Sequence, residues 1–413
     1  MKHDSGLRTQ RDRAERTGDS RRHLLAGVLL TCMILTGIPV GRAAADSSAE
    51  RAAKAVPAAG SAQGPDCVPA AGSAQGPDSV PAAASAQGAD PPAAASAQAS
   101  AADRQSLDDA WWTGPLLAAS AGTLPRGHFL IEPYVFDLMP QARYDVHGNR
   151  QPVPHANDFG SQSYVLYGVT DRVSAGLIPR FGFDQPAMGR GASHIGMGDL
   201  GLQAQYGLSR FQEGTWIPAT ALVFGETLPT GKYDRLADRP ADGLGSGAYT
   251  TTLGLYSQYL WWMPNGRILR TRLDLSYAIS GSASVRDLSV YGTSAGFRGH
   301  AMPGNSFIAD AAGEYSVTSH WVLALDVVYE HDSSTRVNGM QLPTVTPGVG
   351  PPPIGVPAGV VLSSGPSRSV SLAPALEFNI NNRVGVIAGA KLTVSGRNTT
   401  VAVIPVAAIN IVL

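Results

Sequence analysis

From residue 127 to the end of the chain, hydrophobic and polar residues alternate with a period of two. In the segment 320–332, Leu323, Leu325 and Val327 share one parity, whereas Asp326 and Glu330 share the other. Successive side chains of a β-strand point to opposite faces, so this pattern predicts a strand with one apolar and one polar face. The segments 268–280 and 383–395 repeat the pattern.

The same alternation predicts about twelve strands. They cover residues 128–137, 161–169, 172–183, 199–208, 215–226, 249–262, 267–280, 305–317, 320–332, 367–380, 383–395 and 400–413. The joints alternate between short turns (170–171, 209–214, 263–266, 318–319 and 381–382) and long loops (138–160, 184–198, 227–248, 281–304 and 333–366). Outer-membrane barrels have this asymmetry and an even strand number, whereas a soluble sandwich has no reason for it. The facing of 161–169 and 215–226 stays open.

Aromatic residues favour the same fold, because Tyr259, Trp261 and Trp262 gather near one strand end, as in an interfacial girdle. No apolar run reaches the length of about 20 residues that a transmembrane helix needs. The predicted fold class is therefore all-β: a transmembrane antiparallel β-barrel over 127–413, preceded by a disordered linker.

The N-terminal region predicts export. An arginine-rich start is followed by a charge-free stretch, 24–40, and by Ala43-Ala44-Ala45, so residues 1–45 have the features of a cleaved secretory signal peptide. Residues 46–105 repeat a unit of about twelve residues made of Ala, Pro, Gly, Ser and Gln. Such a composition cannot offset the entropy of ordering, which predicts a disordered periplasmic linker; a tether to a periplasmic partner is the alternative. Cleavage at this site would leave Cys67 as the only cysteine.

Between the linker and the first strand lies a pre-barrel segment, residues 106–126, that is far more aromatic than its surroundings. Trp111, Trp112, Leu116 and Leu117 stand in it. Exposed indoles are costly in water, so the segment is expected to be buried. It would either enter the barrel mouth as a plug or anchor the barrel at the membrane interface.

Composition narrows the function classes. Charged residues are 15% of the chain, and the formal net charge is −1, which leaves no electrostatic footprint for nucleic acid. Gly196 to Gly201 matches G-x-G-x-x-G but precedes a strand, and residues 225–232 (GETLPTGK) have the wrong spacing for a phosphate loop. The histidines lack metal-site spacing, so no metal and no cofactor is expected.

Charged residues within the strands share the less apolar parity, so they are expected to line the lumen. They would form a mutually neutralising network or a lining that selects the solute, and the network is the favoured interpretation because both signs occur in similar number. These lumen-lining candidates are Arg180, Arg270, Arg272, Asp274, Asp310, Glu314, Asp326, Glu330, Glu377 and Lys391.

Four motifs in a fixed order resemble a known family: WWTGPLLAASAGTLPRGHFLIEPYVF (111–136), GVTDRVSAGLIPRFGF (168–183), GMGDLGLQAQYGL (196–208) and LPTGKYD (228–234). They are similar to the outer-membrane transporters named for the MetA pathway of phenol degradation. The resemblance covers roughly 106–413 and implies a barrel related to channels for hydrophobic compounds. The Pro- and Gly-rich loop 333–366 has no counterpart in it.

The favoured function is a passive channel for small hydrophobic or aromatic solutes in the outer membrane of a Gram-negative bacterium, not an enzyme. Its expected partners are outer-membrane lipid, the solute and the barrel-assembly machinery. One alternative is an outer-membrane lipid hydrolase, which would need a Ser–His pair on the lipid-facing exterior, where the strand sequences offer no candidate pair. A non-conducting structural or adhesive barrel is the other.

Overall fold

The structure is a computed structural model that describes residues 41–42, 62–63, 104–342 and 357–413. Almost all of the predicted signal peptide and linker, including Cys32 and Cys67, lies outside these residues. The short strands β1 (Gly41–Arg42) and β2 (Ala62–Gln63) pair with each other in antiparallel fashion. The candidate site described below lies in the part of the chain that starts at Arg104.

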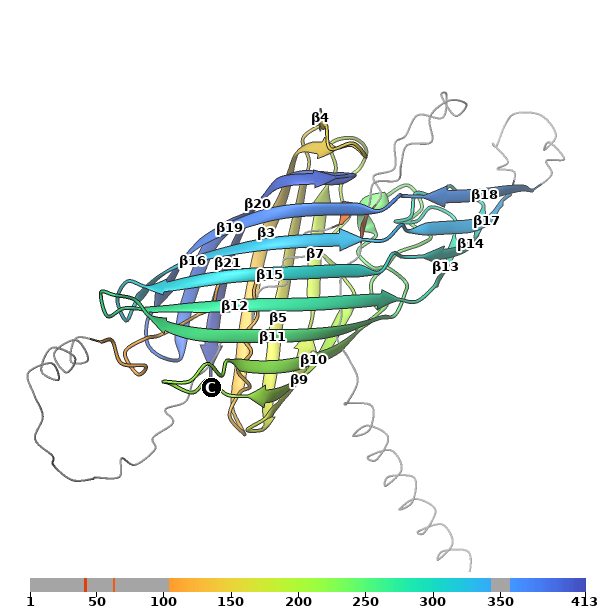
Figure 1. Cartoon of the computed structure of the whole chain (residues 1–413). Helices are drawn as coiled ribbons and strands as arrows, with labels where there is room; N and C mark the ends of the chain where they lie inside the picture. Colours follow the sequence, from red (N-terminus) through yellow and green to blue (C-terminus); the bar gives the residue numbers. More distant parts are fainter. Residues whose placement is uncertain (1–40, 43–61, 64–103, 343–356) are drawn as a thin grey trace, which may run out of the picture.

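Twelve antiparallel strands form a closed barrel (Figure 1). Each is paired with its neighbours in sequence, and the pairing of the last strand with the first closes the barrel. The strands are β3 (Phe129–Tyr144), β5 (Asn157–Thr170), β6 (Val173–Ile178) with β7 (Arg180–Gln185), β8 (Gly196–Met197) with β9 (Leu200–Ser209), β10 (Ala219–Leu228), β11 (Thr250–Trp262), β12 (Ile268–Ser280), β15 (Ser306–Ser316), β16 (Trp321–Asp332), β19 (Ser367–Asn379), β20 (Val384–Arg397) and β21 (Thr399–Val412).

The predicted strand number is confirmed, and most boundaries agree within two residues. The third strand is interrupted at Pro179, which has no N–H group to donate to a neighbouring strand. β10 begins at Ala219, after Pro218, rather than at residue 215. β3 continues to Tyr144, seven residues beyond its predicted end, and pairs there with the short strand β4 (Arg150–Pro152). No helix in the described residues is both long and apolar enough to cross a membrane.

The strands have an apolar outer face. In β16, Leu323, Leu325 and Val327 are exposed, whereas the residues between them are buried. Aromatic side chains border this apolar band: Trp321 contacts Phe378 at one end of the strands, and Phe307 contacts Tyr329 at the other. An apolar band between two aromatic borders is the surface that a membrane barrel presents to lipid. The tight turns between strands lie at the Trp321 end, called the short-turn end below, and the opposite end is the long-loop end.

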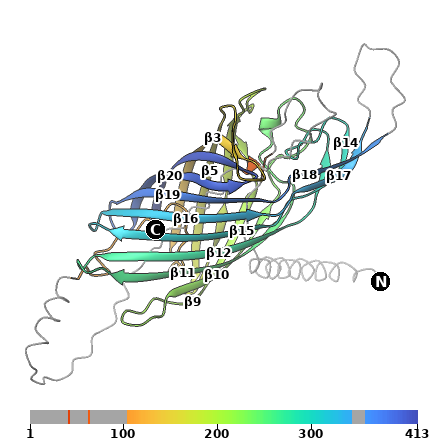
Figure 2. The ribbon, with the colours of Figure 1, turned by 45° about the horizontal axis from the view of Figure 1, so that its top comes forward.

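At the long-loop end, four barrel strands continue into a second, four-stranded sheet, called the extension (Figures 1 and 2). It consists of β13 (Ala283–Arg286), β14 (Phe297–Met302), β17 (Arg336–Gln341) and β18 (Ala358–Ser363). The prediction of plain loops at 281–304 and 333–366 was therefore wrong. Short strands of four to six residues carry too little alternation to be recognised from sequence.

One face of the extension is buried. Val285, Phe297 and Val337 pack there against Leu236 and Tyr291, which belong to loops. The loop between β10 and β11 contains the 3₁₀-helix η1 (Pro240–Asp242), and its Leu244 lies next to Gly182 of β7 and Gly196 of β8. This loop thus reaches from the extension to the β7–β8 side, across the long-loop end of the barrel.

Candidate functional site: the occupied lumen

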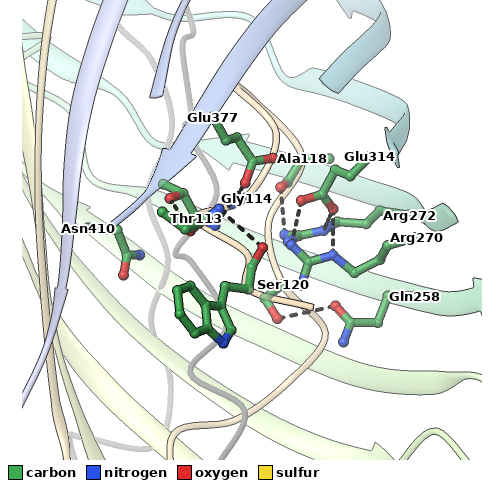
Figure 3. Close-up of polar contacts among 12 residues, drawn as sticks. Thr113, Gly114, Ala118, Ser120, Gln258, Arg270, Arg272, Glu314, Glu377 and Asn410 are labelled. Atoms are coloured by element: carbon green, nitrogen blue, oxygen red, sulfur yellow. Dashed lines mark hydrogen bonds and ion pairs between the residues drawn. The ribbon is translucent and has the colours of Figure 1, made fainter. Parts of the chain in front are cut away.

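The pre-barrel segment lies inside the barrel. Thr113, Leu116 and Ala118 are each at most 1% exposed, and the chain runs among inward-pointing side chains of the barrel strands (Figure 3). The segment enters from the short-turn end, where Gln105 N–H donates to the Gly266 carbonyl at 2.9 Å. It leaves near Leu124, whose N–H donates to Ser174 Oγ at 2.8 Å.

The two tryptophans of the segment occupy different environments. Trp112 is buried, and the Arg270 guanidinium lies over its ring, 4.5 Å from the centroid. Trp111 is half-buried and meets the ring of His320 edge-on at 4.8 Å between centroids. A cation over an indole is favourable, and it is most so where water is excluded. Trp112 is therefore tied to the interior of the barrel, whereas Trp111 lies at its rim.

Carboxylates of the barrel bind the backbone of the segment. Thr113 and Gly114 N–H donate to Glu377 Oε2 at 2.8 and 3.2 Å. The Asp326 carboxylate accepts three consecutive N–H groups, those of Leu116, Leu117 and Ala118, at 2.9 to 3.2 Å. The next N–H along the chain, of Ala119, donates to Asp274. Buried backbone groups need partners, and this segment finds them in side chains because it belongs to no sheet.

The same side of the lumen holds a buried ion-pair network, on the strands β12, β15, β16 and β19. We call it the charged wall. Glu314 lies between Arg270 and Arg272, with Arg270 Nε at 2.6 Å and Arg272 Nε at 3.0 Å from Oε2. Arg272 also donates through Nη1 to the Ala118 carbonyl at 3.0 Å, so the network touches the segment directly (Figure 3). Lys391 of β20 pairs with Glu330 at 2.5 Å.

The opposite side of the lumen, on β3, β5, β20 and β21, is mostly apolar. We call it the apolar wall. Leu116, Leu117 and Leu124 of the segment belong to one buried cluster with its side chains. The residues of this wall are Leu130, Tyr134, Leu138, Tyr164, Leu166, Ile387, Ile404, Val406, Ala408 and Val412. It also contains one carboxylate, Glu132, which accepts a hydrogen bond from Asn410 Nδ2 at 3.1 Å. The segment thus has polar contacts on one side and apolar contacts on the other.

Nine of the ten predicted lumen-lining residues are buried inside the barrel. Arg180 is half-buried and donates to Gln162 Oε1 at 2.9 Å. Sequence reasoning did not select several polar residues that also hold the segment. Gln258 accepts from Ser120 Oγ, Gln205 donates to the Ser120 and Gly122 carbonyls, and Asn379 accepts from Thr113 Oγ1. These amide residues lie at inward-facing positions of their strands, and the same alternation that marks the charged residues in the sequence also marks them.

The loop that crosses the long-loop end is held by polar contacts of its own. Asp199 accepts hydrogen bonds from Gly231 N–H at 2.9 Å and from Ser246 N–H at 2.7 Å. The Tyr291 hydroxyl donates to the Ser246 carbonyl. Burial raises the pKa of the Tyr291 phenol, and the nearby Asp199 raises it further, so this donor keeps its proton. In the described part of the chain, no group of three His, Cys, Asp or Glu side chains could hold a metal ion.

A family model described as putative MetA-pathway of phenol degradation matches residues 136–403, well over half of the chain. The chain belongs to this family. The matched range covers nearly the whole barrel, from within β3 to within β21, together with the extension. The resemblance noted in the sequence is therefore confirmed. No curated protein matches the chain significantly in sequence.

A solved structure of an outer membrane channel has the same barrel fold. A crystal structure of an outer membrane channel from Pseudomonas putida F1 is 14% identical, with a TM-score of 0.52, and the match covers 71% of this chain and 98% of the channel. The β-domain of the Bordetella autotransporter BrkA (9% identity, TM-score 0.35, 68% and 99% covered) and the Pseudomonas putida toluene transporter TodX (14%, 0.25, 70% and 89%) are more distant. With this family and this fold, the chain is an outer-membrane β-barrel.

Proposed function

We propose that the protein is a passive channel through which small hydrophobic or aromatic solutes cross the outer membrane of a Gram-negative bacterium. The short-turn end and the N-terminal linker face the periplasm, and the extension projects from the cell, as in other barrels with short periplasmic turns and long outer loops. The family description, which names a pathway of phenol degradation, and the channel with the same fold support this proposal.

The observation that most strongly supports a gated channel is that the pre-barrel segment fills the lumen. Its backbone donates to Glu377, Asp326 and Asp274, and its leucines pack on the apolar wall. A twelve-stranded barrel is wider than one filled by its own side chains, so an inserted segment can close it. We propose that residues 106–126 are the plug that keeps the channel closed, and that transport requires the plug to move.

The apolar wall supports the solute class. A solute that passes where Leu116 and Leu117 lie would contact Leu130, Tyr134 and Val406. Transfer of apolar surface from water to such a wall is favourable by about 25 cal/mol per Å², whereas a strongly hydrated solute would lose its water on that side without new hydrogen bonds. A path along this wall therefore favours apolar molecules.

A flux assay tests the proposal. The purified full-length protein is placed in liposomes, and the entry rates of a phenolic solute and of a sugar are compared with those of protein-free liposomes. The phenolic solute should enter faster than it enters protein-free liposomes. The protein should increase its entry rate by a larger factor than it increases the entry rate of the sugar. Absence of protein-dependent flux for either solute would leave the structural barrel as the better interpretation.

The described residues offer the hydrolase alternative two Ser–His pairs that the sequence did not suggest. In the loop before β8, Ser193 Oγ lies 2.8 Å from His194 Nδ1, but this hydroxyl also lies within hydrogen-bond distance of both carboxylate oxygens of Asp242, so the serine hydrogen is directed at an acid and not at a base. On the exposed face of the extension, Ser284 Oγ lies 3.5 Å from His300 Nδ1. This separation is at the limit of a hydrogen bond, and a nucleophilic serine needs a close base that a third group orients. The pair lies outside the lumen, and the family and its structural neighbours favour transport. Release of fatty acid from phospholipid vesicles that Ser284→Ala abolishes would reverse this preference.

A further inference from the structure

The outer surface at the long-loop end carries a set of unpaired arginines, which we call the arginine face. Its members are exposed residues of the extension and of the adjoining barrel strands: Arg286, Arg298, Arg336, Arg368 and Arg397. Arg286 lies directly opposite Arg298 on the neighbouring strand, and Arg368 lies directly opposite Arg397. Like charges in directly opposed positions destabilise a sheet, so such pairs call for a bound anion.

The strands that form this face supply no anion to it, and the nearby loop residue Asp234 accepts from the backbone N–H of Arg286. The strands β13, β14, β17, β18, β19, β20 and β21 contain one carboxylate, Glu377, and it points into the lumen. Within the described part of the chain, none of the five guanidinium groups forms an ion pair or a hydrogen bond. The sequence between β17 and β18, residues 342–357, contains no charged residue at all.

The aromatic residues that border the apolar band indicate where the arginine face lies relative to the membrane. Tyr329 of β16 contacts Phe307 at the edge of the apolar band. His331 is the next residue on the same face of β16, and it pairs in register with Arg368. The first arginines therefore lie directly beyond the apolar band, at the depth of lipid headgroups, and those of the extension lie farther from the membrane.

Hydrogen-bonding side chains lie among the arginines. Ser284, His300 and Asn338 form one cross-strand row on the exposed face of the extension, beside the row that contains Arg286 and Arg298. The opposite face of this sheet is buried against the loops that cross the barrel, so the exposed face points outward. A grid of guanidinium, hydroxyl, imidazole and amide groups suits a phosphorylated sugar, because arginine binds phosphate through two parallel hydrogen bonds.

We propose that the arginine face binds the phosphorylated headgroup of a glycolipid of the lipid A type, the anionic lipid of the outer leaflet. This inference takes from the proposed function only the orientation of the barrel, with the extension outside the cell. Lipid bound there would bridge β13 and β14, and β19 and β20, and would neutralise the opposed arginine pairs.

Native mass spectrometry of the purified full-length protein in detergent, titrated with bisphosphorylated lipid A, tests the proposal. The double variants Arg368→Gln/Arg397→Gln and Arg286→Gln/Arg298→Gln should each bind at least about tenfold more weakly, because the loss of even one of the two charge-assisted contacts has that effect. The matched control Arg126→Gln/Arg383→Gln changes two exposed arginines at the short-turn end and should bind as the wild type does. Heat-modifiable migration on gels shows that each variant is folded.

Two further arms identify the ligand. Lipid A from which both phosphates have been removed should bind the wild type as weakly as phosphorylated lipid A binds Arg368→Gln/Arg397→Gln. Inorganic phosphate at the same concentration should not displace the lipid. Undiminished binding to both arginine-face variants, equal loss in the short-turn control, or ready displacement by inorganic phosphate would each overturn the proposal. Because binding is measured without transport, a negative flux assay would leave this result unaffected.

Discussion

The charged wall and the apolar wall enclose the same segment but stabilise it in different ways. On the charged wall, Glu377 and Asp326 together accept five backbone N–H groups of the segment. On the apolar wall, Tyr134 and Ile404 lie in the cluster that buries the leucines of the segment. One wall satisfies the main chain, and the other removes apolar side chains from water.

This difference explains how a chain without secondary structure can be buried. An extended segment outside any sheet has free N–H groups, and each would cost free energy if it lost water without gaining a partner. Carboxylates supply those partners, and an apolar lining alone would not. An entirely polar lumen, in turn, would gain nothing from Leu116 and Leu117. The two walls together make the lumen complementary to this amphipathic segment.

The largest effect is expected from a change within the charged wall, because Arg270 and Arg272 share Glu314 in a fully buried network. Glu314→Gln leaves both guanidinium groups without that carboxylate and should lower the free energy of unfolding by about 3–5 kcal/mol. Ile404→Val on the apolar wall, the matched control, should cost only about 1 kcal/mol. Urea unfolding in detergent measures both. Equal costs would mean that the two walls stabilise the barrel alike.

A cavity on the apolar side should weaken the burial of the plug rather than the barrel. Leu116 is fully buried, so Leu116→Ala should destabilise the inserted state by about 2–5 kcal/mol. Amide hydrogen exchange should accelerate at residues 113–119 and stay unchanged in β3 and β21. Leu107→Ala, at the half-buried start of the segment, serves as the control and should have a small effect. Acceleration throughout the barrel would show that the segment is a structural core and not a separable plug.

Loss of the carboxylate that binds the backbone should open the channel. Asp326→Asn keeps one acceptor oxygen but removes the charge to which three N–H groups donate, and each charge-assisted hydrogen bond contributes about 1.5–3 kcal/mol. Basal single-channel conductance should therefore rise. Asp310→Asn makes the same chemical change on the same wall, where no hydrogen bond to the plug exists among the described residues. It should leave the conductance at the wild-type value; a rise in both variants would point to lumen charge instead of plug release.

The smallest effect on barrel stability is expected from the two tryptophans, Trp111 at the rim and Trp112 beneath Arg270. Replacement of both Trp111 and Trp112 by Ala removes the indole beneath Arg270, a contact that contributes about 0.5–2 kcal/mol, and the edge contact with His320. Conductance in planar bilayers should rise and discrimination between aromatic and polar solutes should weaken, whereas heat-modifiable migration should hardly change. Unchanged conductance with reduced barrel stability would instead identify the pair as an interfacial anchor.

Most of the barrel could be predicted from the sequence, because lipid on one face and a polar lumen on the other impose an alternation that each strand displays by itself. In β16, the exposure of Leu325 and the burial of Asp326 follow directly from their parity. The extension could not be predicted in the same way. Its two hairpins join into one sheet only because β14 pairs with β17, across the whole of β15 and β16.

The lumen shows the same division. The sequence by itself determined that charged residues point inward and that the segment with Trp111 and Trp112 needs burial, since both follow from the cost of exposing a side chain to the wrong solvent. Only the tertiary structure decided that Glu314 pairs with two arginines and that Asp326 accepts backbone N–H groups. The contacts of Asp326 join residues up to 210 positions apart, and the closed barrel around the segment, which no local pattern encodes, brings them together.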